Sequence, residues 1–328
     1  MKSFQPPPPT LVADLGRETS EAGADWPRRI AIIGAAGTVG SSVAAHIALA
    51  GLGRELFLVD VRENLVASHA IDITDAQVVA HVPAPRVVNG APADGPVDVV
   101  VVAASKPEVP DGDRNDFLDA NTELLGLLRP QIESLAGPGG LVLLLSNPVD
   151  ILAGWLSRNS SLHAHRILGY SLNDSARFCL AVARVLGVDT ERIEGKVMGE
   201  HGNGQVPLFS SLTLDGQPVA LSASQRDDVL ADVHGWFRRW SDLEPGRSSG
   251  WATGVGVRYL LQELQAGRPV VTTASTEHLD DYPGSFIALE VRRTEDRIDV
   301  LPPAAEPTEA LELLAAARRV QAEVDALA

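Results

Sequence analysis

The stretch RRIAIIGAAGTVGSSVAAHIALAG, residues 28–51, constrains the fold more than any other part of the chain. It starts with an apolar run, passes through Gly34, Gly37 and Gly40, and continues with apolar residues at helical spacing. A run without polar alternation is typical of a strand in a parallel sheet that is covered on both faces. Glycines at this position allow a tight turn and let the helix pack closely on the strand. We therefore predict a strand, a glycine-rich turn and a helix, in that order.

The same order of apolar runs and helical segments continues along the first half of the chain. RELFLVD, PVDVVVVAAS and GGLVLLLSNPVD read as buried strands, and helical patterns lie between them. Strands that alternate with helices predict an α/β fold with a doubly wound parallel sheet. After about residue 150, helices mix with antiparallel-looking strands such as PVVTTAS and GSFIALEVRR. We predict a flexible Pro-rich arm at 1–27, a doubly wound domain at 28–150 and a mixed α+β domain at 151–328.

The glycine loop also predicts what the first domain binds. Glycines leave room for a pyrophosphate beside the helix N-terminus, where free N–H groups and the helix dipole favour an anion. Asp60 ends the second predicted strand, where a carboxylate can accept both hydroxyls of a ribose and would repel a 2′-phosphate. The pattern predicts a Rossmann domain that binds NAD rather than NADP. The loop residues expected to contact NAD are Gly34, Ala36, Gly37, Thr38, Val39 and Gly40.

Composition excludes several other classes of partner. Lys and Arg number 27 against 43 Asp and Glu, which gives a formal net charge of −16. Such a surplus disfavours nucleic acid and anionic membranes, and no apolar run approaches the about 18 residues that span a bilayer. The single cysteine, Cys179, excludes an internal disulfide and a cysteine-based zinc cluster, and no metal site is expected. We expect a cytoplasmic protein.

Three further motifs complete a recognisable set: LSNPVD, LNDSARF and MGEHGNGQVP. Together with the glycine loop, they resemble the lactate/malate dehydrogenase family, from about residue 28 to the C-terminus. The resemblance implies an NAD-dependent enzyme that interconverts a 2-oxo acid and a 2-hydroxy acid by hydride transfer. It also implies a homodimer or homotetramer.

The motifs supply the groups that this reaction needs. His201 suits the acid/base role, because the ordinary pKa of imidazole lies near neutrality. Asp174 would orient that histidine and stabilise its charged form, and in the family it pairs with it. Arg177 follows one helical turn later, and its planar fork suits a substrate carboxylate. Asn147, at a strand end, could contact both the reacting oxygen and the nicotinamide side.

Other positions follow from the resemblance alone. Arg114 matches the family's mobile arginine, which polarises the substrate carbonyl when its loop closes. Asn121 matches a cofactor-contacting position. Ser249, before GWATG, stands where members of the family have Thr or Ser near the nicotinamide.

The stretch AASKPEVPDGDRND departs from the family pattern at the position that reads the substrate, and it also carries Asp111 and Asp113 where small or neutral residues are more usual. Six residues before the mobile arginine, the family has arginine for malate or glutamine for lactate, whereas this chain has Glu108. A carboxylate facing the second carboxylate of oxaloacetate at about 4 Å would be repelled by several kcal/mol. Glu108 therefore predicts a substrate other than malate, with a cationic or hydrogen-bond-donating side chain.

Three alternatives stay open on the sequence. An ordinary malate dehydrogenase could use Lys106 for the second carboxylate, if the loop folds in another register. A related NAD-using glycosidase would need a metal held by Cys and His. A catalytically silent NAD-binding regulatory protein would keep the fold without turnover, although no catalytic position is lost.

Overall fold

A computed structural model describes residues 26–106, 114–202, 204–295 and 297–327, with the backbone alone for Arg114–Asp116. Most of the predicted arm, residues 1–25, lies outside the described residues. Trp26 packs under Arg293, whose guanidinium carbon is 4.1 Å from the centre of the indole ring.

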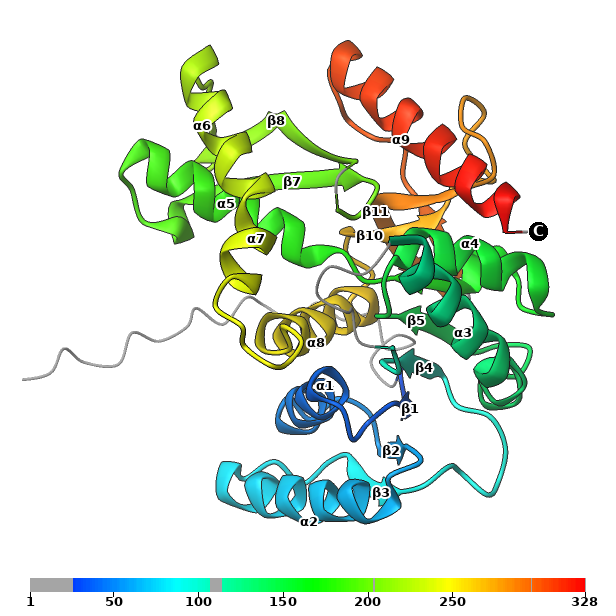
Figure 1. Cartoon of the computed structure of the whole chain (residues 1–328). Coiled ribbons are helices and arrows are strands. Elements are labelled where there is room, and N and C mark those ends of the chain that lie inside the picture. The colour runs from blue at the N-terminus through cyan, green and yellow to red at the C-terminus, as the bar shows by residue number, and fades with distance from the viewer. Residues whose placement is uncertain (1–25, 107–113, 203, 296, 328) are drawn as a thin grey trace, which may run out of the picture.

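Strands and helices alternate over the first half of the chain and mix over the second (Figure 1). The strands are β1 Arg29–Ile33, β2 Glu55–Val59, β3 Arg86–Asn89, β4 Val99–Val102, β5 Leu141–Leu144, β6 Ile167–Gly169, β7 Ile193–Gly199, β8 Gln205–Leu214, β9 Gln217–Pro218, β10 Val270–Ser275, β11 Phe286–Thr294 and β12 Arg297–Val300. The helices are α1 Thr38–Leu49, α2 Glu63–Ala80, α3 Arg114–Ala136, α4 Val149–Asn159, α5 Leu172–Leu186, α6 Ala223–His234, α7 Trp236–Ser241, α8 Trp251–Gln265 and α9 Pro307–Ala326, with 3-10 turns at Ala164–Arg166 and Thr190–Arg192.

In the part of the chain that the structure describes, the strands form a twelve-stranded sheet in the order β3-β2-β1-β4-β5-β6-β10-β11-β7-β8-β9, with β12 paired to β11. The first six strands in this order pair in parallel, as in a doubly wound Rossmann sheet. The remaining neighbours pair antiparallel, from β6–β10 onward. The predicted fold class is thus confirmed. The last parallel strand, β6, was not predicted, because its three residues are too few to show a pattern in the sequence.

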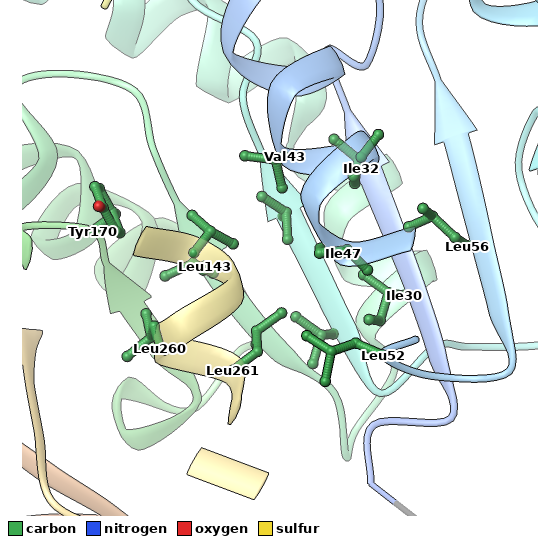
Figure 2. Close-up of a cluster of buried hydrophobic side chains, with 14 of the residues drawn as sticks. Ile30, Ile32, Val43, Ile47, Leu52, Leu56, Leu143, Tyr170, Leu260 and Leu261 are labelled. Carbon is green, nitrogen blue, oxygen red and sulfur yellow. The ribbon is translucent and has the colours of Figure 1, made fainter. Parts of the chain in front are cut away.

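Both faces of the parallel sheet are covered by helices, which explains why its strands lack polar alternation. Ile30 and Ile32 of β1 point into a core cluster with α1, α2 and α8, while Ala31 and Ile33 point into a second cluster with α3 and α4. Figure 2 shows Ile30 and Ile32 beside α1, with α8 packed against the same cluster.

The packing of α8 on α1 brings the second half of the chain to the glycine loop. Leu260 and Leu261 of α8 are fully buried in the same cluster as Val43 and Ile47 of α1 (Figure 2). At the start of α8, Gly250 lies so close to the loop that a Cβ there would be 3.0 Å from the carbonyl oxygen of Thr38. No helix in the described part of the chain is long and apolar enough to cross a bilayer.

Candidate active site

The turn between β1 and α1 forms an open cradle at the helix N-terminus. Gly34 has φ +86°, and a Cβ there would lie 2.4 Å from the backbone nitrogen of Ala104. A Cβ at Gly40 would lie 2.2 Å from the carbonyl oxygen of Gly34, so the helix can pack this closely only without a side chain. Gly37 precedes α1, and no side chain caps the first turn of that helix. The free N–H groups of this turn fit an anion such as a pyrophosphate.

Asp60 lies directly beside this cradle. Its Oδ2 accepts the N–H of Ala36 at 3.1 Å, and its Oδ1 accepts the N–H of Arg62 at 3.0 Å. Burial alone would raise the pKa of Asp60, but the N–H donors of Arg62 and Ala36 and the Arg62 guanidinium lower it overall. A stable carboxylate at the end of β2, next to the anion cradle, is the arrangement that an adenosine ribose requires. The residues present therefore fit NAD.

On the substrate side, His201 and Asp174 form a hydrogen-bonded pair. His201 follows β7 and donates from Nδ1 to Oδ2 of Asp174 on α5, at 2.6 Å. The side chains are 19% and 5% exposed. Burial lowers the pKa of His201, but the charge and hydrogen bond of Asp174 outweigh it, so the pKa is raised overall. This pairing leaves Nε2 of the imidazole available to exchange a proton with a ligand.

A second carboxylate, Asp150 of the LSNPVD motif, supports the same histidine. Its Oδ2 accepts the backbone N–H of His201 at 2.6 Å, and its Oδ1 accepts the hydroxyl of Thr273 at 2.6 Å. Asp150 is 2% exposed, and burial raises its pKa to about 6. It was not among the residues predicted from the sequence. The signal was present, because an acid follows the apolar strand and Asn-Pro, but the pattern does not say which way it points.

Arg177 lies one helical turn after Asp174 on α5. Its Nη1 is 3.5 Å from Oδ1 of Asp174, and its side chain is 24% exposed. Its guanidinium carbon lies 3.5 Å from the centre of the Trp236 ring on α7. Burial lowers the pKa of Arg177, whereas the charge of Asp174 opposes this shift. Arg177, Asp174 and His201 thus lie together, as the motifs predict.

The other predicted positions differ in what surrounds them. Asn147 is exposed just after β5, at the carboxyl end of the parallel sheet. Asn121 is buried in α3, and its Oδ1 accepts the Ser105 hydroxyl and the Lys106 N–H, both at 2.9 Å. It therefore ties the chain after β4 to α3. Ser249 is half-buried, and its carbonyl accepts the hydroxyl of Thr253 at 3.3 Å.

The structure describes little of the two predicted site residues in the loop before α3. Arg114 begins α3, with its backbone alone described, and Glu108 lies outside the described residues. Among the described residues, no group of three or more His, Cys, Asp and Glu side chains could hold a metal ion.

Known proteins share both halves of this architecture. The NAD-binding domain of lactate/malate dehydrogenases matches residues 28–169, and the α/β C-terminal domain of the same enzymes matches residues 172–234. L-lactate dehydrogenase B of Hordeum vulgare is 30% identical over 281 residues, which cover 80% of each chain. The chain belongs to the lactate/malate dehydrogenase family. It is an NAD-dependent 2-hydroxy acid dehydrogenase.

Relatives of this dehydrogenase include enzymes of both specificities. The malate dehydrogenase of Halobacterium salinarum is 29% identical over 240 residues, which are 72% of this chain and 77% of that protein. Among solved structures, malate dehydrogenase of Cryptosporidium parvum has a TM-score of 0.83 at 23% identity, over 92% of this chain and 99% of that one. Lactate dehydrogenase of the same organism, complexed with lactic acid and NAD, has a TM-score of 0.82 at 22% identity, over 92% and 98%. These structures share the fold of this dehydrogenase, and similarity to them does not distinguish its substrate.

Proposed function

We propose that this dehydrogenase interconverts a 2-oxo acid other than oxaloacetate with its 2-hydroxy acid, and that His201 is its acid/base. The observation that carries the acid/base role is the 2.6 Å hydrogen bond between Nδ1 of His201 and Oδ2 of Asp174. It fixes the tautomer, so that Nε2 faces the substrate, and it stabilises the imidazolium that protonates the substrate oxygen. In the oxidising direction, neutral Nε2 accepts the proton of the hydroxyl.

Arg177 is the proposed anchor for the substrate carboxylate. Its side chain is three-quarters buried, yet its hydrogen bond to Asp174 is long, at 3.5 Å. Buried guanidinium N–H groups that lack a good acceptor favour a bidentate carboxylate. Asp174 thus contacts both the proposed proton donor, His201, and the proposed carboxylate anchor, Arg177. The groups that bind the carbonyl and the carboxylate of a 2-oxo acid are therefore both held by the same turn of α5.

NAD, held by the glycine loop and Asp60, supplies the hydride acceptor or donor when it is bound. Asn147 is proposed to contact the substrate oxygen and the nicotinamide side, because it stands at the carboxyl end of β5. Ser249 is proposed to lie near the nicotinamide by family resemblance, and its neighbour Gly250 lies so close to the loop that a Cβ there would be 3.0 Å from the Thr38 carbonyl oxygen. Arg114 is proposed to polarise the substrate carbonyl and Asn121 to contact the cofactor, both by family resemblance.

The proposed substrate follows from Glu108. The family uses arginine at this position for a second carboxylate, and Glu108 carries the opposite charge. Two carboxylates at 4 Å repel by about 4 kcal/mol at the effective dielectric of a partly closed site. A keto acid whose far end carries an ammonium, a guanidinium or another donor would be attracted instead.

Kinetics with a panel of 2-oxo acids tests this substrate class. NADH oxidation is followed with oxaloacetate, pyruvate and cationic, aromatic and aliphatic 2-oxo acids. Glu108→Arg is expected to raise kcat/KM for oxaloacetate on the order of 100-fold. Asp111→Arg makes the same charge change in the same loop and serves as the control, with a much smaller expected gain. A wild type that prefers oxaloacetate clearly, with little gain from Glu108→Arg, would contradict the proposal and favour Lys106 as the group that binds the second carboxylate.

We also propose that the enzyme is a homodimer or homotetramer. Among the described helices, two each expose three large apolar side chains over 42–81% of their area. They are Ile71, Val78 and Val79 on α2, and Trp251, Val255 and Tyr259 on α8. The three on α8 follow at four-residue spacing and so share one face. Sedimentation velocity is expected to give a multiple of the chain mass, and Val255→Glu is expected to lower it.

A further inference from the structure

The guanidinium of Arg177 is covered on one face by an aromatic ring that no motif contributes. The guanidinium carbon lies 3.5 Å from the centre of the Trp236 ring, which is stacking distance. Trp236 is the first residue of α7, which lies next to α5 in Figure 1. Arginine stacks on indole faces through its charge and its planar π-system, and this interaction strengthens when the pair is shielded from water.

Stacking on Trp236 also determines which donors of Arg177 remain available. A stacked guanidinium keeps its five N–H donors in the plane, pointing away from the ring. In the described part of the chain, one of these donors has a hydrogen-bond acceptor, the Oδ1 of Asp174 at 3.5 Å. The other oxygen of Asp174 is engaged by His201 at 2.6 Å. One face of the guanidinium is therefore occupied, and the rest of its edge has no acceptor among the described residues.

Trp236 also packs on a second indole, which lies on the same helix. Trp240, one helical turn later, packs with its ring centre 6.2 Å from that of Trp236 and with an interplanar angle of 10°. Both rings are half-buried. Among the described residues, Arg177 has a ring contact with Trp236 and none with Trp240, so Trp240 provides a matched control.

We propose that Trp236 is a positioning residue for substrate binding, which fixes the plane of Arg177 so that its free edge meets the substrate carboxylate. The proposal rests on the proposed role of Arg177. Without the ring, the guanidinium would rotate among several conformers, and substrate binding would have to order it again. The affinity for the 2-oxo acid would fall, whereas NAD binding and proton transfer would be little affected, because NAD binds at the glycine loop and the proton is exchanged at His201.

Two substitutions of Trp236 separate stacking from simple packing. Trp236→Leu fills space without a π-face, and Trp236→Phe keeps a smaller π-face. With the best substrate of the 2-oxo acid panel, Trp236→Leu is expected to raise KM about tenfold to thirtyfold, with kcat within about threefold of wild type. Trp236→Phe should stay within about threefold in both parameters, as should Trp240→Leu. NADH affinity, measured by its fluorescence, should be unchanged in all three.

The outcomes distinguish this proposal from the one on which it rests. A wild-type enzyme that reduces none of the 2-oxo acids would overturn the proposed function, and the role of Trp236 with it. An active wild type with a Trp236→Leu variant of unchanged KM would overturn the role of Trp236 alone. Equal losses in the Leu and Phe variants would also overturn it, because they would show a requirement for volume instead of a π-face. Circular dichroism of each variant reports whether it folds, and the Phe variant tests the ring with the smallest change of shape.

Discussion

The carboxylate of Asp150 accepts the backbone N–H of His201 at 2.6 Å, while Asp174 accepts from the ring of the same residue. His201 is thus held by one acid at its main chain and by another at its side chain. Asp150 comes from the start of α4 and Asp174 from α5, so two helices define where the turn after β7 places the imidazole. Burial lowers the pKa of His201, but the charge of Asp150 adds to the larger effect of Asp174 in raising it.

Replacement of Asp150 by Asn tests the cost of burying this charge. An amide fits the same contacts, because its oxygen can accept from His201 and its nitrogen can donate to the Thr273 hydroxyl. Burial raises the pKa of Asp150 from 3.8 to about 6, so folding favours its protonated form. The raised pKa of Asp150 therefore contributes to the free energy of unfolding. This contribution is complete below the ordinary pKa of 3.8 and is lost as pH rises through the folded-state pKa of about 6.

The wild type should therefore lose roughly 1 to 2 kcal/mol of unfolding free energy relative to Asp150→Asn between pH 5 and pH 8. Urea unfolding followed by circular dichroism measures this difference. The other carboxylates titrate in both proteins and cancel in the comparison. If the unfolding free energies of wild type and Asp150→Asn change in parallel with pH across this range, Asp150 has an ordinary pKa in the folded protein.

The Asp174→Asn variant addresses the pairing with His201. The pKa of His201 is raised overall, because Asp174 outweighs the effect of burial, which lowers it. On the proposed role of His201, reduction of a 2-oxo acid needs the protonated imidazole, so kcat/KM in this direction should be high below the raised pKa and should fall as pH rises through it. Asp174→Asn should move this fall to lower pH and reduce the rate on the order of 10²- to 10⁴-fold.

Steady-state kinetics between pH 5 and pH 10 with the preferred 2-oxo acid give this profile. Asp232→Asn makes the same chemical change at an acid of α6 that pairs with Arg184, and it should leave the profile in place. A fall in kcat/KM at the same pH in wild type and Asp174→Asn would mean that another group controls the proton.

The fold was largely predictable because its strands are long or fully apolar. PVDVVVVAAS and PVVTTAS were read as strands and contain β4 and β10, and the glycine turn lies between β1 and α1 as expected. β6 was missed, since its three residues show neither period nor alternation. Its place in the sheet is set by pairing with β5 and β10, which no local pattern records.

Motifs predicted one part of the site, and tertiary contacts supply another. Asp174 and Arg177 share a helix turn, so their proximity follows from spacing. Asp150 and Thr273 are 123 residues apart, and their hydrogen bond depends on β10 lying next to β6. The ring of Trp236 was missed for the same reason, since a Trp pair at four-residue spacing predicts only that both rings share a helix face.

The glycine loop offers a matched pair of substitutions. A Cβ at Gly37 would have its nearest neighbour at 3.4 Å, and the backbone there has φ −79°, which suits alanine. Gly37→Ala should therefore fold normally, yet weaken NADH binding about tenfold or more, because its methyl group lies where the pyrophosphate approaches. Gly40→Ala would place a Cβ 2.2 Å from the Gly34 carbonyl oxygen and should lower the unfolding free energy by a few kcal/mol, about 1 to 3.

Thermal unfolding and NADH fluorescence titration measure both effects. Unchanged NADH affinity in Gly37→Ala would place the pyrophosphate elsewhere. A Gly40→Ala variant as stable as the wild type would show that α1 can move away from β1 at little cost.

We expect Asp60 and Arg62 together to control which dinucleotide the enzyme accepts. The Arg62 guanidinium donates from Nε to Oδ1 of Asp60 at 3.3 Å, and its side chain is 55% exposed. Asp60→Ser removes the charge that repels a 2′-phosphate and frees Arg62 to pair with it, while a hydroxyl remains to accept from the loop. The ratio of kcat/KM for NADPH to that for NADH should rise on the order of 100-fold. The double variant Asp60→Ser/Arg62→Ala should lose most of this gain, since neither charge is then present. If the double variant keeps the full gain, relief of repulsion alone explains it and Arg62 takes no part in cofactor choice.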